Sequence, residues 1–255
     1  MTDQEISQKF ENKVYRFLSR IGKTDKCTED KAKPDFENDK IGYVECTVAR
    51  KGRSSVGEYE VAPIDSKPHI VSDEMAETIT DFMCARIANR LTEKQKQLKK
   101  HLYTHKSIHP NRPRIVCLTV DLIDFSHTYC WLDFWKDALY KLLYKIDCSA
   151  MVLSTGKFHY LPINEDFIKK IREDGLYSDI PIGLFCGTEY SVISGILFVV
   201  PKMLRKEMAN VNIEYDALRD SVEFDYCDFI WLPNPYADVK CEYLDRICVD
   251  GDGKK

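Results

Sequence analysis

Residues 43–48 of this chain read Tyr43-Val44-Glu45-Cys46-Thr47-Val48, and the fold that we expect is built around this segment. Its apolar and β-branched residues are typical of a strand. A glutamate stands inside the strand, and Pro34-Asp35 precedes it, with Asp35 ten positions before Glu45. Charged side chains are rarely buried unless they are paired or bind a metal ion, so the two carboxylates need a reason.

A divalent metal ion is the reason that we favour. Side chains alternate between the two faces of a strand, so Glu45 and Thr47 share one face. If Asp35 ends a neighbouring strand, its carboxylate can approach that of Glu45. Together with the backbone carbonyl of Cys46, the two acids would offer the hard oxygen ligands that Mg²⁺ or Mn²⁺ prefers. Such a site can activate a water and neutralise charge on a phosphodiester.

The elements around this strand predict an α/β fold with a mixed central sheet flanked by helices. Helical spacing of apolar residues predicts a helix over residues 5–21 and a long helix from Asp73 to about Leu102. The remaining predicted elements are strands over residues 115–122, 191–200 and 227–232 and a helix over residues 131–146. With no internal repeat and no clear linker, we expect a core over residues 1–125 and a C-terminal extension over residues 126–255, packed as one domain.

The pair Pro34-Asp35 and Glu45-Cys46-Thr47 resembles the signature of the PD-(D/E)xK nuclease superfamily, over roughly residues 5–122. The resemblance implies a restriction-endonuclease-like core in which Asp35 and Glu45 bind the metal ion. It also implies a lysine two residues after Glu45 that positions or activates the attacking water. Thr47 stands at that position here, and a threonine cannot supply a positive charge. Either another residue substitutes for the lysine, or the site is inactive.

The long helix offers a substitute lysine. Its apolar stripe runs through Ile87, Leu91 and Leu98. The same helical steps place Lys94 on the side that faces the sheet, where a solvated lysine is not expected. Lys94 is therefore our first choice for the displaced lysine, with Lys96 as the competing candidate.

Two further residues enter through the resemblance. Gln97 lies three residues beyond Lys94 on a neighbouring part of the helix face, and superfamily members place a glutamine or lysine near the site on this helix. Glu11 on the first helix matches a glutamate that supports the metal ion in many members. The resemblance thus implies catalytic roles for Asp35, Glu45, Lys94 and Gln97, and a supporting metal ligand in Glu11.

Cations follow the motif directly at Arg50, Lys51 and Arg53, which we take as candidate phosphate contacts for nucleic acid. A second group of cations, near the end of the long helix, is explained slightly better by a solvated helix C-terminus, where positive charge is favourable. The net charge of -4 argues mildly against strong nonspecific binding of nucleic acid.

The cysteines and the amino terminus bear on the compartment. Ten cysteines without a Cys-x-x-Cys pair argue against a zinc site, and several stand in apolar runs. We therefore expect a reducing, cytoplasmic environment. The first residues lack the features of a signal peptide, and no apolar run is long enough to cross a bilayer, so we expect no membrane partner. An oligomer is left open.

We therefore expect a nuclease that uses Mg²⁺ or Mn²⁺ to hydrolyse phosphodiester bonds of nucleic acid, with DNA as the expected substrate and the choice between DNA and RNA left open. The alternative is a catalytically inactive protein of the same fold that binds nucleic acid or serves as a scaffold. An unrelated α/β enzyme would follow if Asp35 and Glu45 lay far apart. His101 and His105 have the i, i+4 spacing of metal ligands, but no helical acid completes a His-Glu-x-x-His motif, so we expect no metal role for them.

Overall fold

A computed structural model of the 255-residue chain describes residues 3–27, 33–49, 73–120, 138–146, 181–201 and 227–249. The chain divides into two compact units. Unit 1 comprises Met1–Ala49, Arg90–Val120 and Gly187–Lys255, and unit 2 comprises Arg50–Asn89 and Asp121–Cys186. Elements from both sides of residue 125 therefore belong to unit 1, while the predicted division of the chain at that residue stays a prediction.

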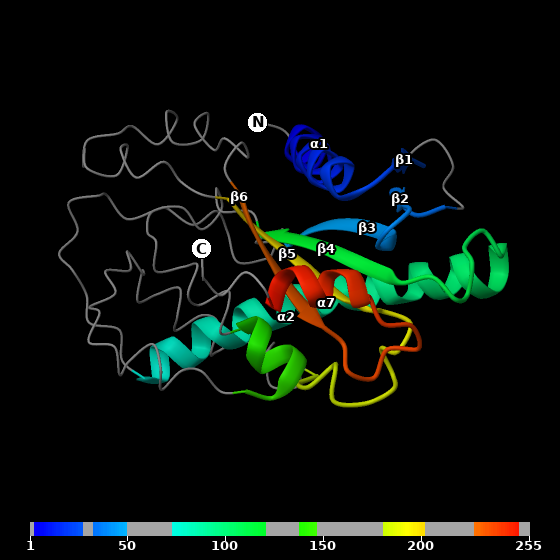
Figure 1. The fold of residues 1–255 in the computed structure, drawn as a ribbon. Coiled ribbons are helices and arrows are strands. Elements are labelled where there is room, and N and C mark those ends of the chain that lie inside the picture. Colours follow the sequence, from blue (N-terminus) through cyan, green and yellow to red (C-terminus); the bar gives the residue numbers. More distant parts are fainter. Residues whose placement is uncertain are drawn as a thin grey trace, which may run out of the picture. The chain divides into compact units, whose positions relative to one another are not determined.

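A six-stranded sheet with the order β1-β2-β3-β4-β5-β6 forms the centre of unit 1 (Figure 1). β1, β2 and β3 pair antiparallel, β3, β4 and β5 pair parallel, and β6 returns antiparallel to β5. The mixed central sheet that the sequence predicts is confirmed. The strands are β1 (Thr24–Lys26), β2 (Phe36–Asn38), β3 (Gly42–Ala49), β4 (Arg114–Val120), β5 (Gly195–Pro201) and β6 (Cys227–Pro233).

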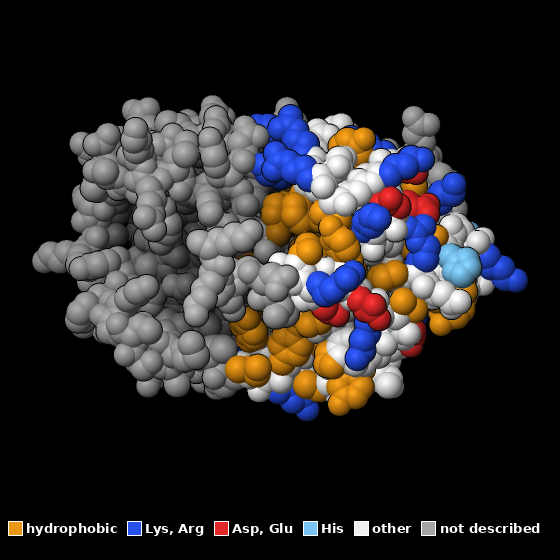
Figure 2. All heavy atoms as spheres, in the orientation of Figure 1, with side chains coloured by type: hydrophobic (Ala, Val, Ile, Leu, Met, Phe, Trp, Pro, Cys, Tyr) orange, Lys and Arg blue, Asp and Glu red, His pale blue; other side chains and the backbone are white. Residues whose placement is uncertain are grey.

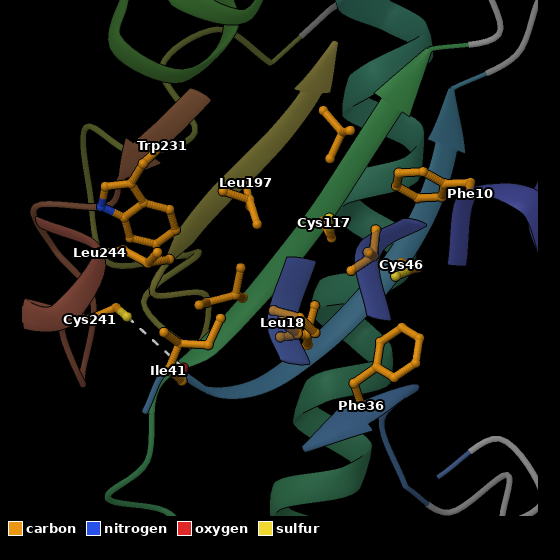
Figure 3. Close-up of a cluster of buried hydrophobic side chains, with 14 of the residues drawn as sticks. Phe10, Leu18, Phe36, Ile41, Cys46, Cys117, Leu197, Trp231, Cys241 and Leu244 are labelled. Atoms are coloured by element: carbon orange, nitrogen blue, oxygen red, sulfur yellow. Dashed lines mark hydrogen bonds between the residues drawn. The ribbon is translucent and has the colours of Figure 1, made fainter. Parts of the chain in front are cut away.

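One face of the sheet is covered by α1 (Asp3–Ile21) and α7 (Glu242–Val249), whose apolar side chains form a buried hydrophobic core with the strands (Figure 3). On β3 the residues that join this core are Val44, Cys46 and Val48. Because side chains alternate along a strand, Glu45 faces the other side of the sheet. The core members from the two helices are Phe10, Val14, Leu18 and Leu244.

The helix α2 (Asp73–Lys99) begins in unit 2, and its residues from Arg90 onward belong to unit 1. In unit 1 it reaches the sheet face that carries Glu45, through Lys94. The sequence predicts a helix that ends near Leu102, but the α-helix changes at Lys100 into a π-helix, η1 (Lys100–His105). Among the described residues, no helix has the length and apolar character that a membrane span requires.

The predicted strand over residues 191–200 begins later, at Gly195. The residues before it form turns, in which the Ser191 and Ile193 amides donate to the carbonyls of Thr188 at 3.1 Å and Tyr190 at 2.9 Å. A strand ladder cannot use amides that are already engaged in turns. β5 and β6 come from the segment expected to be an extension, yet they complete the central sheet.

In unit 2, the first part of α2 contacts a second helical segment at residues 138–144. Lys141 Nζ donates to Asp81 Oδ1 at 2.7 Å, and the Cys84 thiol lies 3.3 Å from the carbonyl of Ala138. This segment is the described part of the helix predicted over residues 131–146. Residues 131–137 and the stretch from Arg50 to Ser72 lie outside the described residues.

Candidate functional site

The antiparallel register of β2 and β3 places Asp35 opposite Glu45. Phe36 of β2 pairs with Val44 of β3. Continuing this register by one residue brings Asp35, which stands just before β2, opposite Glu45. Among the described residues this ladder ends at Val44, and we call residues 45–49 of β3, on that side of the strand, the β3 edge. Asp35 Oδ2 accepts a hydrogen bond of 2.7 Å from the backbone amide of Cys46 at this edge. The amide and carbonyl of one strand residue point to the same side, so the Cys46 carbonyl faces the same edge.

The position of Asp35 depends on how β2 is held, and Asn38 holds it. This side chain is fully buried at 0% exposure. Its Nδ2 donates to the carbonyl of Leu18 at 3.0 Å and to Thr24 Oγ1 at 2.9 Å. Its Oδ1 accepts from the amides of Lys40 at 2.9 Å and Ile41 at 3.1 Å. One amide group therefore ties β2 to α1, to β1 and to the turn into β3.

Lys94 reaches Glu45 from the facing helix, as the helical spacing predicts. Lys94 Nζ donates to Glu45 Oε2 at 2.8 Å and to Gln97 Oε1 at 3.1 Å. The glutamate side chain is fully buried at 0% exposure, and the lysine side chain retains 16%. The competing candidate, Lys96, is exposed on the same helix. The structure thus brings Lys94 and Gln97 to Glu45, while their catalytic roles stay predictions.

The charges at the site shift one another's protonation. The pKa of Asp35 is raised to about 6: burial raises it most, the Glu45 carboxylate adds to the rise, and Lys94 and the Cys46 amide oppose it. Burial lowers the pKa of Lys94, but the carboxylates of Glu45 and Asp35 outweigh burial, so the net shift is upward. Lys94 is therefore an ammonium at neutral pH and can donate hydrogen bonds, but it cannot accept a proton.

Glu11 on α1 belongs to the same electrostatic neighbourhood. Burial raises the pKa of its carboxyl, whereas Lys94 and Lys26 lower it. Glu11 in turn contributes to the raised pKa of Asp35. A helix on one side of the sheet and a helix on the other thus both place a charged side chain near the β3 edge, while the role of Glu11 as a supporting metal ligand stays a prediction.

The structure places His101, for which the sequence predicts no metal role, against Glu45. The imidazole is 1% exposed, and its Nε2 lies 3.2 Å from Glu45 Oε1, the carboxylate oxygen that Lys94 does not contact. The spacing held a signal for this contact, because His101 follows Lys94 by seven residues, which is two helical turns on the same stripe. Periodicity alone could have nominated it as a partner of Glu45.

The donors at the β3 edge match a hard divalent cation in kind. Mg²⁺ is commonly held by one or two carboxylates and several waters rather than by a complete protein cage. Asp35, Glu45 and the Cys46 carbonyl would supply this set. Within the described residues there is no ready group of three or more His, Cys, Asp or Glu side chains placed to hold a metal ion. A cation bound here would share Glu45 with Lys94.

The proposed phosphate contacts Arg50, Lys51 and Arg53 lie outside the described residues. Other cations are visible in the described part, and Figure 2 shows Lys and Arg side chains gathered over α1. Along this helix they recur at three- and four-residue steps, which puts them on one stripe. The members of this stripe are Lys9, Lys13, Arg16 and Arg20.

A comparison with protein-family models, with curated proteins and with solved structures finds no match to this chain. The superfamily membership expected from Pro34-Asp35 and Glu45-Cys46-Thr47 therefore stays a prediction. We infer function from the ion pair between Lys94 and Glu45 and from the electrostatic effect of both groups on Asp35.

Proposed function

We propose that this protein is a metal-dependent nuclease that hydrolyses phosphodiester bonds of nucleic acid, with DNA as the substrate and the cytoplasm as the compartment. The observation that carries the proposal is the ion pair between Lys94 and Glu45, at 2.8 Å, beside Asp35. Thr47 stands where the motif has a lysine, and Lys94 from α2 reaches the Glu45 carboxylate. The Lys94 ammonium thus supplies, beside Glu45, the positive charge that the sequence motif lacks.

Each residue would have a separate task. Asp35, Glu45 and the Cys46 carbonyl would hold Mg²⁺ or Mn²⁺, which when bound activates water and neutralises phosphate charge. Asp35 must lose its proton to bind a cation, and its pKa of about 6 permits this at neutral pH. The Lys94 ammonium would orient a water or stabilise the charge that develops on the phosphate. Gln97 accepts a hydrogen bond from Lys94 and would keep its amine directed at the site.

The test is cleavage of supercoiled DNA and of RNA by the purified protein with Mg²⁺ or Mn²⁺. We expect nicking that EDTA stops and that Asp35→Ala and Glu45→Ala abolish. Lys94→Met should lose activity, whereas Lys96→Met, an exposed lysine of the same helix, should keep it. Cleavage that persists in both carboxylate variants would refute the proposal.

A second candidate is a noncatalytic protein that binds nucleic acid or serves as a scaffold. It is favoured by one observation: Lys94 donates a hydrogen bond of 2.8 Å to one oxygen of Glu45, and His101 Nε2 lies 3.2 Å from the other, so nitrogen groups already occupy positions beside both oxygens. Titration calorimetry with Mn²⁺ separates the two functions. A nuclease should bind Mn²⁺ and lose this binding in Glu45→Gln, whereas the second candidate should bind nucleic acid without affinity for the metal ion.

A further inference from the structure

We propose that His101 is a positioning residue of this site, which fixes the Glu45 carboxylate at the oxygen that Lys94 does not contact. The inference rests on the function proposed above for its effect on catalysis. It adds a third side chain to the pair that the sequence predicts, and it gives the π-helix η1 a role in building the site.

The geometry around Glu45 carries the first step. Its two oxygens face two nitrogen groups of the same helical segment: Oε2 lies 2.8 Å from Lys94 Nζ, and Oε1 lies 3.2 Å from His101 Nε2. Both the carboxylate and the imidazole are buried, at 0% and 1% exposure. Rotation of the carboxylate about its last torsion would break the hydrogen bond from Lys94 and would move Oε1 away from the imidazole nitrogen. The pair therefore sets the direction in which Glu45 presents its oxygens.

Glu45 Oε1 is a buried carboxylate oxygen, and leaving it without a hydrogen-bond donor is costly. Among the residues that the structure describes, no donor is aligned for a hydrogen bond to Glu45 Oε1. A buried polar atom in this state is costly, and a buried charge more so. His101 Nε2 is within reach, and the terminal torsion of a histidine is soft. A small rotation of the ring would bring its N–H into line with Oε1.

The backbone of His101 is held unusually firmly, and this is the third step. Three donors converge on its carbonyl: the amide of Lys106, the amide of Ser107 at 3.0 Å and the hydroxyl of Ser107 at 3.4 Å. Lys106 adopts a left-handed conformation, with φ of 51°, to make this closure. Such a conformation is unfavourable for a lysine, and π-helical turns are often found at functional sites. The unfavourable conformation of Lys106 thus occurs at the residue whose amide holds the His101 carbonyl.

A spectroscopic experiment tests the contact without any need for catalysis. In ¹⁵N-labelled full-length protein, long-range proton–nitrogen correlation spectra of the imidazole show which ring nitrogen carries the proton. We expect the proton of His101 on Nε2, directed at Glu45. A spectrum with the proton on Nδ1 and a bare Nε2 would overturn the proposal, because two acceptors would then face each other.

A kinetic experiment tests the effect on the site with a matched set of variants. His101→Leu removes the donor, His101→Gln keeps an amide donor near the position of Nε2, and His105→Leu changes an exposed histidine one turn away. We expect His101→Leu to lower kcat by about 10-fold to 100-fold, as for other groups that orient metal ligands. KM for DNA should stay nearly constant, because His101 is buried away from the substrate, and His101→Gln should regain most of the loss.

The outcomes separate this inference from the proposed function. Equal kcat for His101→Leu and His105→Leu, in a protein whose cleavage depends on Asp35 and Glu45, would overturn the role of His101 alone. A fall of the same size in His101→Gln would also count against it, since a general packing defect would then explain the loss. If the wild-type protein cleaves neither DNA nor RNA, the proposed function fails, and the position of the imidazole proton decides whether His101 holds Glu45.

Discussion

Replacing Lys94 by methionine should destabilise the protein strongly, because it leaves the Glu45 carboxylate buried without its main partner. Methionine keeps most of the length and apolar contact of the lysine stem while removing the charge. The matched control is Lys96→Met, which makes the same change at an exposed position of the same helix.

The expected size follows from the geometry of the pair. Two unit charges at the observed 2.8 Å attract each other by about 6 kcal/mol at an effective dielectric constant of about 20. The cost of desolvating both groups offsets much of this attraction, so the intact pair contributes little net stability. Removing one partner is different, since the other charge stays buried, and such changes cost about 3–5 kcal/mol. We expect about 3 kcal/mol for Lys94→Met, because His101 still lies against Glu45.

Urea unfolding followed by far-UV circular dichroism at pH 8 measures this difference, provided that the denaturant slope stays constant among the variants. Lys96→Met should lie within about 0.5 kcal/mol of the wild type, as surface changes usually do. The double variant Lys94→Met/Glu45→Gln should be about 2 kcal/mol more stable than Lys94→Met alone, because the unpaired charge is gone. A Lys94→Met protein within about 1 kcal/mol of Lys96→Met would refute the buried ion pair.

Three further predictions follow from contacts at the site. Because burial raises the pKa of Asp35 to about 6, the native state holds more protons than the unfolded state between about pH 4 and pH 6, and stability falls as pH rises through this range. Asp35→Asn should therefore be more stable than the wild type at pH 8, by up to about 3 kcal/mol, and should show no gain in stability below pH 4. Urea unfolding of both proteins at a series of pH values measures this difference. A variant that is less stable than the wild type at pH 8 would contradict the prediction. Mn²⁺ affinity, measured by calorimetry, should weaken as pH falls through about 6, since protonated Asp35 is a poor ligand, and a flat profile would exclude Asp35 from the site. Asn38→Ala should cost about 2–4 kcal/mol, because it orphans buried amide and carbonyl groups; a loss below about 1 kcal/mol would show that β2 is held by other contacts.

Periodicity was sufficient for some parts of this site because it depends on local geometry alone. Helical steps from Leu91 and Leu98 put Lys94 on the sheet-facing side, and the strand period put Glu45 on the face opposite the core with α1. The same steps lead to His101, whose spacing from Lys94, rather than from His105, indicates a partner of Glu45. The nucleic-acid contacts of Arg50, Lys51 and Arg53 stay predictions.

Local periodicity was enough to predict α1, most of α2, the strands from β3 to β6 and the faces of Glu45 and Lys94, since these follow from the repeat of the helix and the strand. The partners that meet across the chain are visible in the folded protein alone. The bond from the Cys46 amide to Asp35, the inclusion of β5 and β6 in the central sheet, and the closure of η1 on the His101 carbonyl all depend on it. Pairing between distant segments is chosen by the free energy of the whole core, so no local pattern of residues specifies it.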